Sequence, residues 1–309
     1  MPDIETKENY RVAVLLACHN GKPWIGSQIE SILSQAGVNV TVFVSDDASS
    51  DGTDAYVNEL SAKDDRIHLL DHEVKGSAGK NFYHLLLNTD LSEFNYIAYA
   101  DQDDIWDTNK LIRHIRICRE QHADGVSSNV IAFWADGREK LIQKAQPQRD
   151  LDFMFESAGP GCTFLMTPWL VNQVKLCLQD ENSPAREVAL HDWLTYAVCR
   201  AGGRKWVIDP FPSVRYRQHE SNVVGANAGF KAKLVRLNRL RQGWYRAEVA
   251  KVSRVCAAIT EHDEIRIVSQ LLANFGCMSR LKLLGYIGQA RRRWRDRFFL
   301  AISIVLFIF

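Results

Sequence analysis

Acidic residues gather in the segment Asp101-Gln102-Asp103-Asp104, which directly follows the apolar run 96–100. Carboxylates this close repel one another by roughly a few kcal/mol, so we expect a cation to neutralise them. Because oxygen ligands with no nearby histidine or cysteine pair favour hard ions, Mg2+ or Mn2+ is the predicted cation. The alternative is that Asp103 and Asp104 cap a helix that begins near Asp107. Their position after an apolar strand favours the cation site.

A second acidic pair, Asp46 and Asp47, ends another apolar run, 38–45. The residues that follow are turn formers, and Asp51 or Thr53 is a suitable cap for the next helix. Capping accounts for these downstream residues but not for the pair itself. Two adjacent carboxylates at a strand end are able to accept hydrogen bonds from a nucleobase or a ribose, so we expect a nucleotide contact here.

Asp192 is a candidate general base. It stands at the start of a helical stretch between His191 and Trp193, and aromatic surroundings can raise the pKa of a carboxyl group toward a value suited to proton abstraction. The alternative is a carboxylate that only interacts favourably with the helix dipole. The residue types alone leave both interpretations open.

The elements that position these residues alternate between strands and helices over roughly the first 135 residues. Apolar, β-branched runs predict strands, and the stretches between them have helical spacing. The predicted strands are 12–18, 38–45, 66–70 and 96–100, and the predicted helices are 24–35, 53–62, 79–88 and 107–121. Such alternation is typical of parallel strands with crossover helices, in which ligands bind at the carboxyl ends of the strands. We therefore expect both acidic clusters and the segment Cys18-His19-Asn20-Gly21 to converge at one edge of the sheet.

The second half of the chain has a less regular pattern. Gly159-Pro160-Gly161 precedes a predicted strand at 162–166, and Pro168 is predicted to begin a helix. We further predict a helix at 187–200, a short strand at 205–209, a loop at 211–227, and helices from there to the end. A boundary near residues 225–229 would separate a domain of residues 1–226 from a helical region of residues 227–309.

The formal net charge of +1 conceals two unequal parts. Residues 230–309 contain 16 lysines and arginines but 5 aspartates and glutamates, so the remainder is acidic. The basic stretch 291–297 precedes an apolar run, 298–309, which is too short to cross a bilayer because a span needs about 20 residues. We expect this tail to lie in the membrane interface with its positive charges near lipid phosphates. The alternative is a hydrophobic helix that packs on the body of the protein.

The compartment is also indicated by the sequence. The seven cysteines are scattered, odd in number and without a Cys-x-x-Cys pair, which favours a reducing environment. The N-terminus is acidic and lacks the basic-then-apolar order of a signal peptide. Nucleic-acid binding is not expected, because the basic tail carries terminal hydrophobic residues and no nucleic-acid motif. We therefore expect a cytoplasmic protein attached peripherally to the inner face of a bacterial plasma membrane.

The chain resembles the glycosyltransferase family 2 enzymes, especially the rhamnosyltransferase-like branch of bacterial surface polysaccharide synthesis. The resemblance covers about residues 11–225, and its motifs occur in the family's order. They are Asn20-Gly21, the segment 46–53, Gly79-Lys80-Asn81-Phe82, the segment 100–106, Gly161-Cys162-Thr163, His191-Asp192-Trp193-Leu194, Tyr216-Arg217-Gln218-His219 and the segment 221–225. Together and in order, they are highly specific.

The resemblance implies an α/β fold of the GT-A type, with a Rossmann-like, mostly parallel sheet between helices, followed by a C-terminal helical segment. It also implies an inverting transfer from a nucleoside diphosphate sugar. Asp47 would bind the nucleobase, Asp101 the ribose, and Asp103 with His219 the Mn2+ or Mg2+ ion, while Asp192 would be the general base. The remaining residues implied for the donor are Ala17, His19, Asn20, Lys80 and Gln102, and those implied for the acceptor side are Gly161, Cys162, His191 and Trp193.

Two positions depart from the family pattern. His19 stands where many members have tyrosine, which affects the preference for the nucleobase, and His191 stands where many have glutamate.

The leading hypothesis is transfer of L-rhamnose from dTDP-rhamnose to a lipid-linked oligosaccharide in the synthesis of O-antigen or another surface polysaccharide. A UDP-hexose donor on the same fold, or a non-catalytic membrane scaffold, are the alternatives.

Overall fold

The computed structural model describes residues 9–70, 73–219, 243–306 and 308–309. In its first half, four parallel strands alternate with helices, as the sequence predicts. The strands are β1 (Tyr10–Cys18), β2 (Val38–Asp46), β3 (Ile67–Leu69) and β4 (Tyr96–Asp101), and the helices are α1 (Ile25–Leu33), α2 (Thr53–Ser61), α3 (Ala78–Asn88) and α4 (Lys110–Gln121). Strand β1 pairs with both β2 and β4, and β2 pairs with β3.

Both faces of β1 are buried, because crossover helices cover the sheet on either side. Ala13 and Leu15 point into a core shared with α3, while Val12, Val14 and Leu16 point into a second core with α1 and α4. This burial explains why β1 is a continuous apolar run and not an alternating one.

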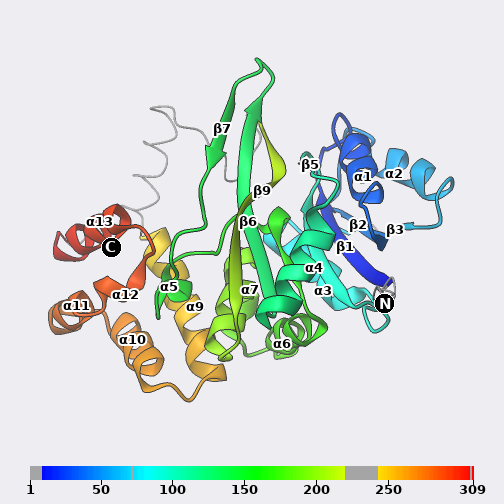
Figure 1. Cartoon of the computed structure of the whole chain (residues 1–309). Coiled ribbons are helices and arrows are strands. Elements are labelled where there is room, and N and C mark those ends of the chain that lie inside the picture. Colours follow the sequence, from blue (N-terminus) through cyan, green and yellow to red (C-terminus); the bar gives the residue numbers. More distant parts are fainter. Residues whose placement is uncertain (1–8, 71–72, 220–242, 307) are drawn as a thin grey trace, which may run out of the picture.

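The second half of the sheet is mixed, so the mostly parallel arrangement holds for the first half alone. Strand β8 (Leu165–Met166) joins the edge of β4 in the antiparallel direction, and β6 (Gly125–Trp134) runs antiparallel to β8. Strand β9 (Trp206–Gln218) is parallel to β6, and the short strands β5 (Ile105–Trp106) and β7 (Glu139–Ile142) complete the sheet as antiparallel partners of β9 and β6. In Figure 1, β6 and β7 form a hairpin that extends beyond the rest of the sheet.

Several predicted bounds in this half are wrong. The expected loop at 211–227 is strand as far as Gln218, and the expected strand at 162–166 begins with a 3-10 turn, η1 (Gly161–Thr163). Helix α7 (His191–Ala201) starts later than residue 187, which lies instead in the turn η2 (Pro184–Glu187). Pro168 does begin a helix, α6 (Pro168–Gln179), because proline suits the first helical turn.

The C-terminal region is helical throughout its described part, as predicted. It comprises α9 (Trp244–Ile259), α10 (Asp263–Ala273), α11 (Cys277–Leu284), α12 (Ile287–Ala290) and α13 (Trp294–Val305). These helices lie on the side of the molecule opposite α1 and α2 (Figure 1). Their apolar side chains join the core that contains α3, α6 and α7. The predicted boundary at 225–229 falls outside the described residues.

No helix in the ranges that the structure describes has the length and apolar character needed to cross a bilayer.

Candidate active site

The carboxyl ends of β1, β2 and β4 bring the predicted clusters together. In the sheet register, Cys18 lies opposite Asp46, and Ala17 lies opposite Asp101. The side-chain amide of Gln102 ties the strand ends together, because its Oε1 accepts from His19 N at 2.7 Å and its Nε2 donates to His19 O at 2.9 Å. The predicted convergence at one edge of the sheet is confirmed.

A network of hydrogen bonds fixes the loops around this edge. Asn20, whose backbone is left-handed with φ 50°, donates from its N–H to Ser49 Oγ at 2.7 Å and accepts from Ser50 N at 2.8 Å. The ring Nδ1 of His19 lies 2.6 Å from Asp47 O. Asn20 and His19 therefore join the loop after β1 to the loop after β2.

The two acids of the first pair have different surroundings. Asp46 accepts from Ser49 N at 2.9 Å and so closes its own turn. Asp47 Oδ1 accepts from Lys75 N at 2.5 Å and Gly76 N at 2.9 Å, and thereby holds the segment that leads into α3. Lys80 lies on the exposed first turn of α3, beyond this contact.

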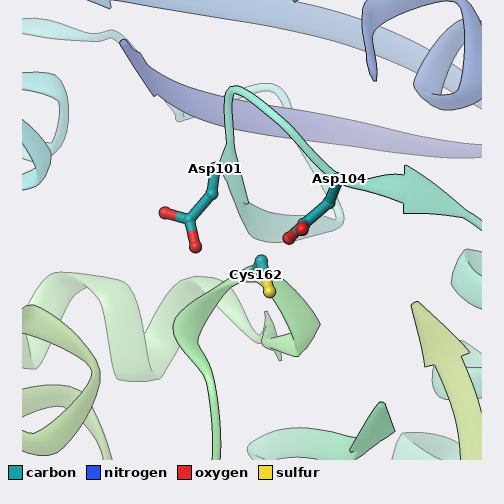
Figure 2. A group of neighbouring side chains, drawn as sticks. All are labelled: Asp101, Asp104 and Cys162. Carbon is teal, nitrogen blue, oxygen red and sulfur yellow. The ribbon is translucent and has the colours of Figure 1, made fainter. Parts of the chain in front are cut away.

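The second acidic cluster forms a compact group below the strand ends. Ligand atoms of Asp101, Asp104 and Cys162 all lie within 4.8 Å of one another, and Figure 2 shows the three side chains converging. Beside them, Asp103 Oδ2 lies 2.5 Å from His219 Nε2. The His219 ring stacks on Trp24 with a centroid distance of 4.2 Å. The two residues implied for the metal are therefore neighbours, although 116 positions separate them in the chain.

Burial and mutual repulsion dominate the electrostatics of this cluster. Burial raises the pKa of Asp101, and the charges of Asp103 and Asp192 raise it further. Burial likewise raises the pKa of Asp104 and of the Cys162 thiol well above their ordinary values. A divalent cation would relieve this repulsion, and the carboxylate oxygens with one imidazole suit Mg2+ or Mn2+. The residues present thus fit the implied ion.

Asp192 faces the acidic cluster from the first turn of α7. Burial raises its pKa to about 6, opposed by the Trp193 N–H, by a hydrogen bond from Ser157, and by the charge of Lys144. A carboxylate with this pKa is ionised near neutral pH and yet basic enough to accept a proton. Asp192 therefore has the properties of a general base.

The residues on either side of Asp192, His191 and Trp193, are held by packing and hydrogen bonding within the protein. The His191 ring stacks on Phe82 at 3.7 Å, and burial lowers its pKa to about 3, so the ring is neutral. A Cβ at Gly161 would lie 2.5 Å from His191 Nε2, so only glycine permits this approach. Trp193 is 3% exposed and donates from Nε1 to Phe153 O at 2.8 Å.

Two residues implied for acceptor contact, Trp193 and Cys162, have buried side chains, and their role toward an acceptor stays a prediction. Trp193 supports the backbone before the 159–161 turn, and the Cys162 thiol packs beneath the acids.

Three further residues of the site carry no motif signal of their own and were not predicted. They are Trp24 beside His219, Ser157 beside Asp192, and Arg217, whose Nε donates to Asp103 O at 2.8 Å. Of these three residues, Arg217 alone lies inside a matched motif, 216–219, which indicates that it is near the site.

Comparisons with known proteins identify the family. Residues 13–166 match the sequence model of Glycosyl transferase family 2. The dTDP-rhamnosyl transferase RfbG of Shigella flexneri is 38% identical over 296 residues, which cover 95% of this chain and 100% of that protein. The chain belongs to glycosyltransferase family 2. The enzyme also shares 39% identity over 171 residues with WfgD of Escherichia coli, a UDP-Glc:alpha-D-GlcNAc-diphosphoundecaprenol beta-1,3-glucosyltransferase, covering 53% of this chain and 63% of WfgD.

Solved structures support the fold of this glycosyltransferase. TarS residues 1–349 from S. aureus superimpose with a TM-score of 0.57 at 14% identity, over 96% of this chain and 80% of that one. The mannosyltransferase PcManGT from Pyrobaculum calidifontis gives a TM-score of 0.50 at 14% identity, over 97% and 85% of the two chains. The predicted family and its α/β GT-A fold with C-terminal helices are confirmed.

Proposed function

We propose that this glycosyltransferase transfers L-rhamnose from dTDP-rhamnose, with inversion, to a lipid-linked oligosaccharide. The observation that carries the proposal is a buried carboxyl group with a raised pKa, Asp192, beside an acidic cluster in a chain that matches the whole length of RfbG. A UDP-hexose donor is the second candidate, favoured by the likeness to WfgD.

The donor would lie across the strand ends. Asp47 and His19 would contact the nucleoside, and Asp101 the ribose, while Asn20 and Gln102 keep the surrounding loops in place. Asp103 and His219 would hold the divalent ion. When bound, such an ion supplies positive charge that stabilises the departing diphosphate. The structure of PcManGT in complex with GDP-Man and Mn2+ is consistent with this assignment.

Asp192 would remove the proton from the acceptor hydroxyl as that oxygen attacks the anomeric carbon. The bond between the anomeric carbon and the diphosphate oxygen breaks on the opposite face, and the nucleoside diphosphate leaves with the bonding electrons. The burial that raises the pKa of Asp192 also limits competing access of water.

The exposed surface of α13 is suited to contact with a membrane, as a membrane-attached acceptor would require. Trp294, Phe298, Phe299 and Val305 are each more than half exposed on this helix, whereas Leu300 and Ile304 pack inward. The exposed Arg293 and Arg295 border the apolar face. Aromatic and aliphatic side chains edged by arginines suit the surface of a bilayer containing anionic lipid. We propose that this face attaches the enzyme peripherally to the membrane that holds its acceptor.

A donor screen tests the reaction. The enzyme is incubated with Mn2+ and each of dTDP-rhamnose, UDP-glucose and UDP-GlcNAc, with GlcNAc-diphosphoundecaprenol in detergent, and products are detected by mass. We expect a mass gain of one deoxyhexose with dTDP-rhamnose. A hexose gain from a UDP donor would favour the second candidate, and no transfer from any donor would count against both.

Two substitutions separate the proposed roles. Asp103→Ala should abolish transfer and weaken Mn2+-dependent binding of the nucleoside diphosphate. Asp192→Asn should abolish transfer but leave that binding nearly intact. An equal loss of binding in both variants would remove the assignment of Asp192 as the base.

Liposome flotation tests the membrane face. Replacing Trp294, Phe298 and Phe299 by serine should release the enzyme from vesicles that contain phosphatidylglycerol. The matched control is Leu176→Ser, because Leu176 is similarly exposed at 59% but lies on α6. Unchanged flotation of the triple variant would refute the attachment.

A further inference from the structure

The segment 152–157 carries three carbonyl groups that are held by two different parts of the chain. Phe153 O accepts from Trp193 Nε1 at 2.8 Å, from the helix that bears the general base. Phe155 O accepts from the Tyr245 hydroxyl at 2.6 Å, and Ser157 O accepts from Arg292 Nη2 at 2.7 Å. The segment is thus clamped between α7 and the C-terminal helical region.

Arg292 is the buried cation of this clamp. Its side chain is 1% exposed, and its guanidinium lies 3.3 Å from Asp152 Oδ2 and 3.4 Å from Glu156 Oε2. Its backbone N–H also donates to Glu156 Oε1 at 2.5 Å. Asp152 is fully buried as well, and its other oxygen accepts from the Tyr196 hydroxyl at 2.8 Å. Arg292 therefore does not face lipid, contrary to the expectation for the stretch 291–297.

Ser157 connects this clamp to the site. Its carbonyl is held by Arg292 and its hydroxyl donates to Gly159 O at 3.0 Å, while the same side chain lies beside the Asp192 carboxylate and lowers its pKa. The next residues form the tight turn that ends at Gly161, whose Cα backs onto His191. A shift of Ser157 would therefore move a hydrogen-bonding partner of the base.

We propose that Arg292 is a positioning residue for catalysis, which fixes Ser157 and through it the orientation of Asp192. This inference rests on the proposed role of Asp192 as the base. It gives the C-terminal region a part in the chemistry that is separate from membrane attachment, because Arg292 points inward and the exposed face of α13 points outward.

Steady-state kinetics of the full-length enzyme test the inference, with dTDP-rhamnose, Mn2+ and GlcNAc-diphosphoundecaprenol in detergent. Arg292→Met and Ser157→Ala should each lower kcat by about 10- to 100-fold, the range that small misplacements of a reacting group cause. KM for the donor should change less than about twofold. Because both substitutions disrupt one unit, the double variant should be little worse than the worse single variant.

Arg113→Met is the matched control, because Arg113 also pairs with a buried aspartate, Asp209, but at the far end of β9. It should lower the melting temperature and leave kcat at low temperature unchanged. An equal fall of kcat in Arg113→Met, or additive effects of Arg292→Met and Ser157→Ala, would reduce Arg292 to a stabilising residue and overturn the proposal.

Two further measurements keep the outcomes separate. If Asp192→Asn retains transfer, the proposed base fails. If Asp192→Asn is inactive but Ser157→Ala is fully active, the positioning role alone fails. Should Arg292→Met not fold, or the acceptor not be used, amide hydrogen exchange of Ser157→Ala decides: faster exchange at residues 191–193 is expected, and unchanged exchange refutes the coupling.

Discussion

The acid limb of the pH–rate profile is the sharpest test of the proposed base. Burial favours the neutral form of a carboxyl group and raises the pKa of Asp192 to about 6. Because the ionised form accepts the proton, kcat should fall as the pH drops through about 6. With one ionisation, the rate at pH 5 should be about one tenth of its plateau value.

The assay measures kcat from pH 5 to 8.5 at saturating donor, acceptor and Mn2+. Saturating metal matters, because the pKa of Asp101 is also raised and its protonation would weaken the cation site. Ser157→Ala should move the limb to higher pH, since the Ser157 hydrogen bond lowers the pKa of Asp192. A rate that stays level down to pH 5, or a limb that Ser157→Ala does not move, would refute the reasoning.

Acid unfolding can be told apart from loss of the base. A carboxyl group whose pKa is raised on folding stabilises the fold most below its unfolded pKa of about 3.9, and this contribution is lost as the pH rises through about 6. The Asp192 contribution to stability therefore increases on acidification while kcat falls. Melting temperatures measured across the same pH range provide the control.

Three other substitutions have expected outcomes set by the local geometry. Gly161→Ala places a Cβ 2.5 Å from His191 Nε2 and should reduce kcat by about 100-fold with the fold retained, as circular dichroism would show. Trp24→Ala removes the stack on His219 and should raise the apparent Mn2+ constant by about fivefold, whereas Trp24→Phe should largely restore it. Asp209→Asn weakens an ion pair of 2.5 Å between a buried aspartate and the half-exposed Arg113, and should cost about 1–2 kcal/mol in chemical denaturation, with activity retained at low temperature.

The first half of the fold was predictable because its central strands, β1 and β4, are apolar on both faces. Apolar runs such as 12–18 and 96–100 predict buried parallel strands. The polar residues that follow them then fall at one edge of the sheet. The convergence of Asp101 with the loop after β1 follows from that geometry.

Strand β6 and the part of β9 beyond Asp209 were missed because polar side chains and prolines occupy the centres of these strands. Ser128 and Ser213 hydroxyls bond to each other at 2.6 Å across the pair, and Asn129 Nδ2 donates to Pro210 O at 2.7 Å. A shift of register at Asn129 accommodates the Pro210-Phe211-Pro212 segment. These polar groups are satisfied only once the two strands meet, so the local sequence gives no sign of a buried strand.

The sequence alone also could not predict which arginines of the tail are buried and which are exposed. Arg292 and Arg293 are adjacent and identical in type, yet one is buried against Asp152 while the other is exposed. The partner lies 140 positions away, and nothing in the local pattern identifies it.

The choice of cation ligand follows from what holds each acid in place. Asp104 is fully buried and accepts from Arg217 N at 3.0 Å, and the buried amine of Lys110 lies close enough to interact with its charge. Burial lowers the pKa of Lys110 to about 7, opposed by Cys162 and Asp104, whereas burial and the charges of Asp103 and Asp101 raise the pKa of Asp104 well above its ordinary value. Since burial favours the neutral form of Asp104, we infer that Asp103, which lies beside His219, is the carboxylate that would hold the cation.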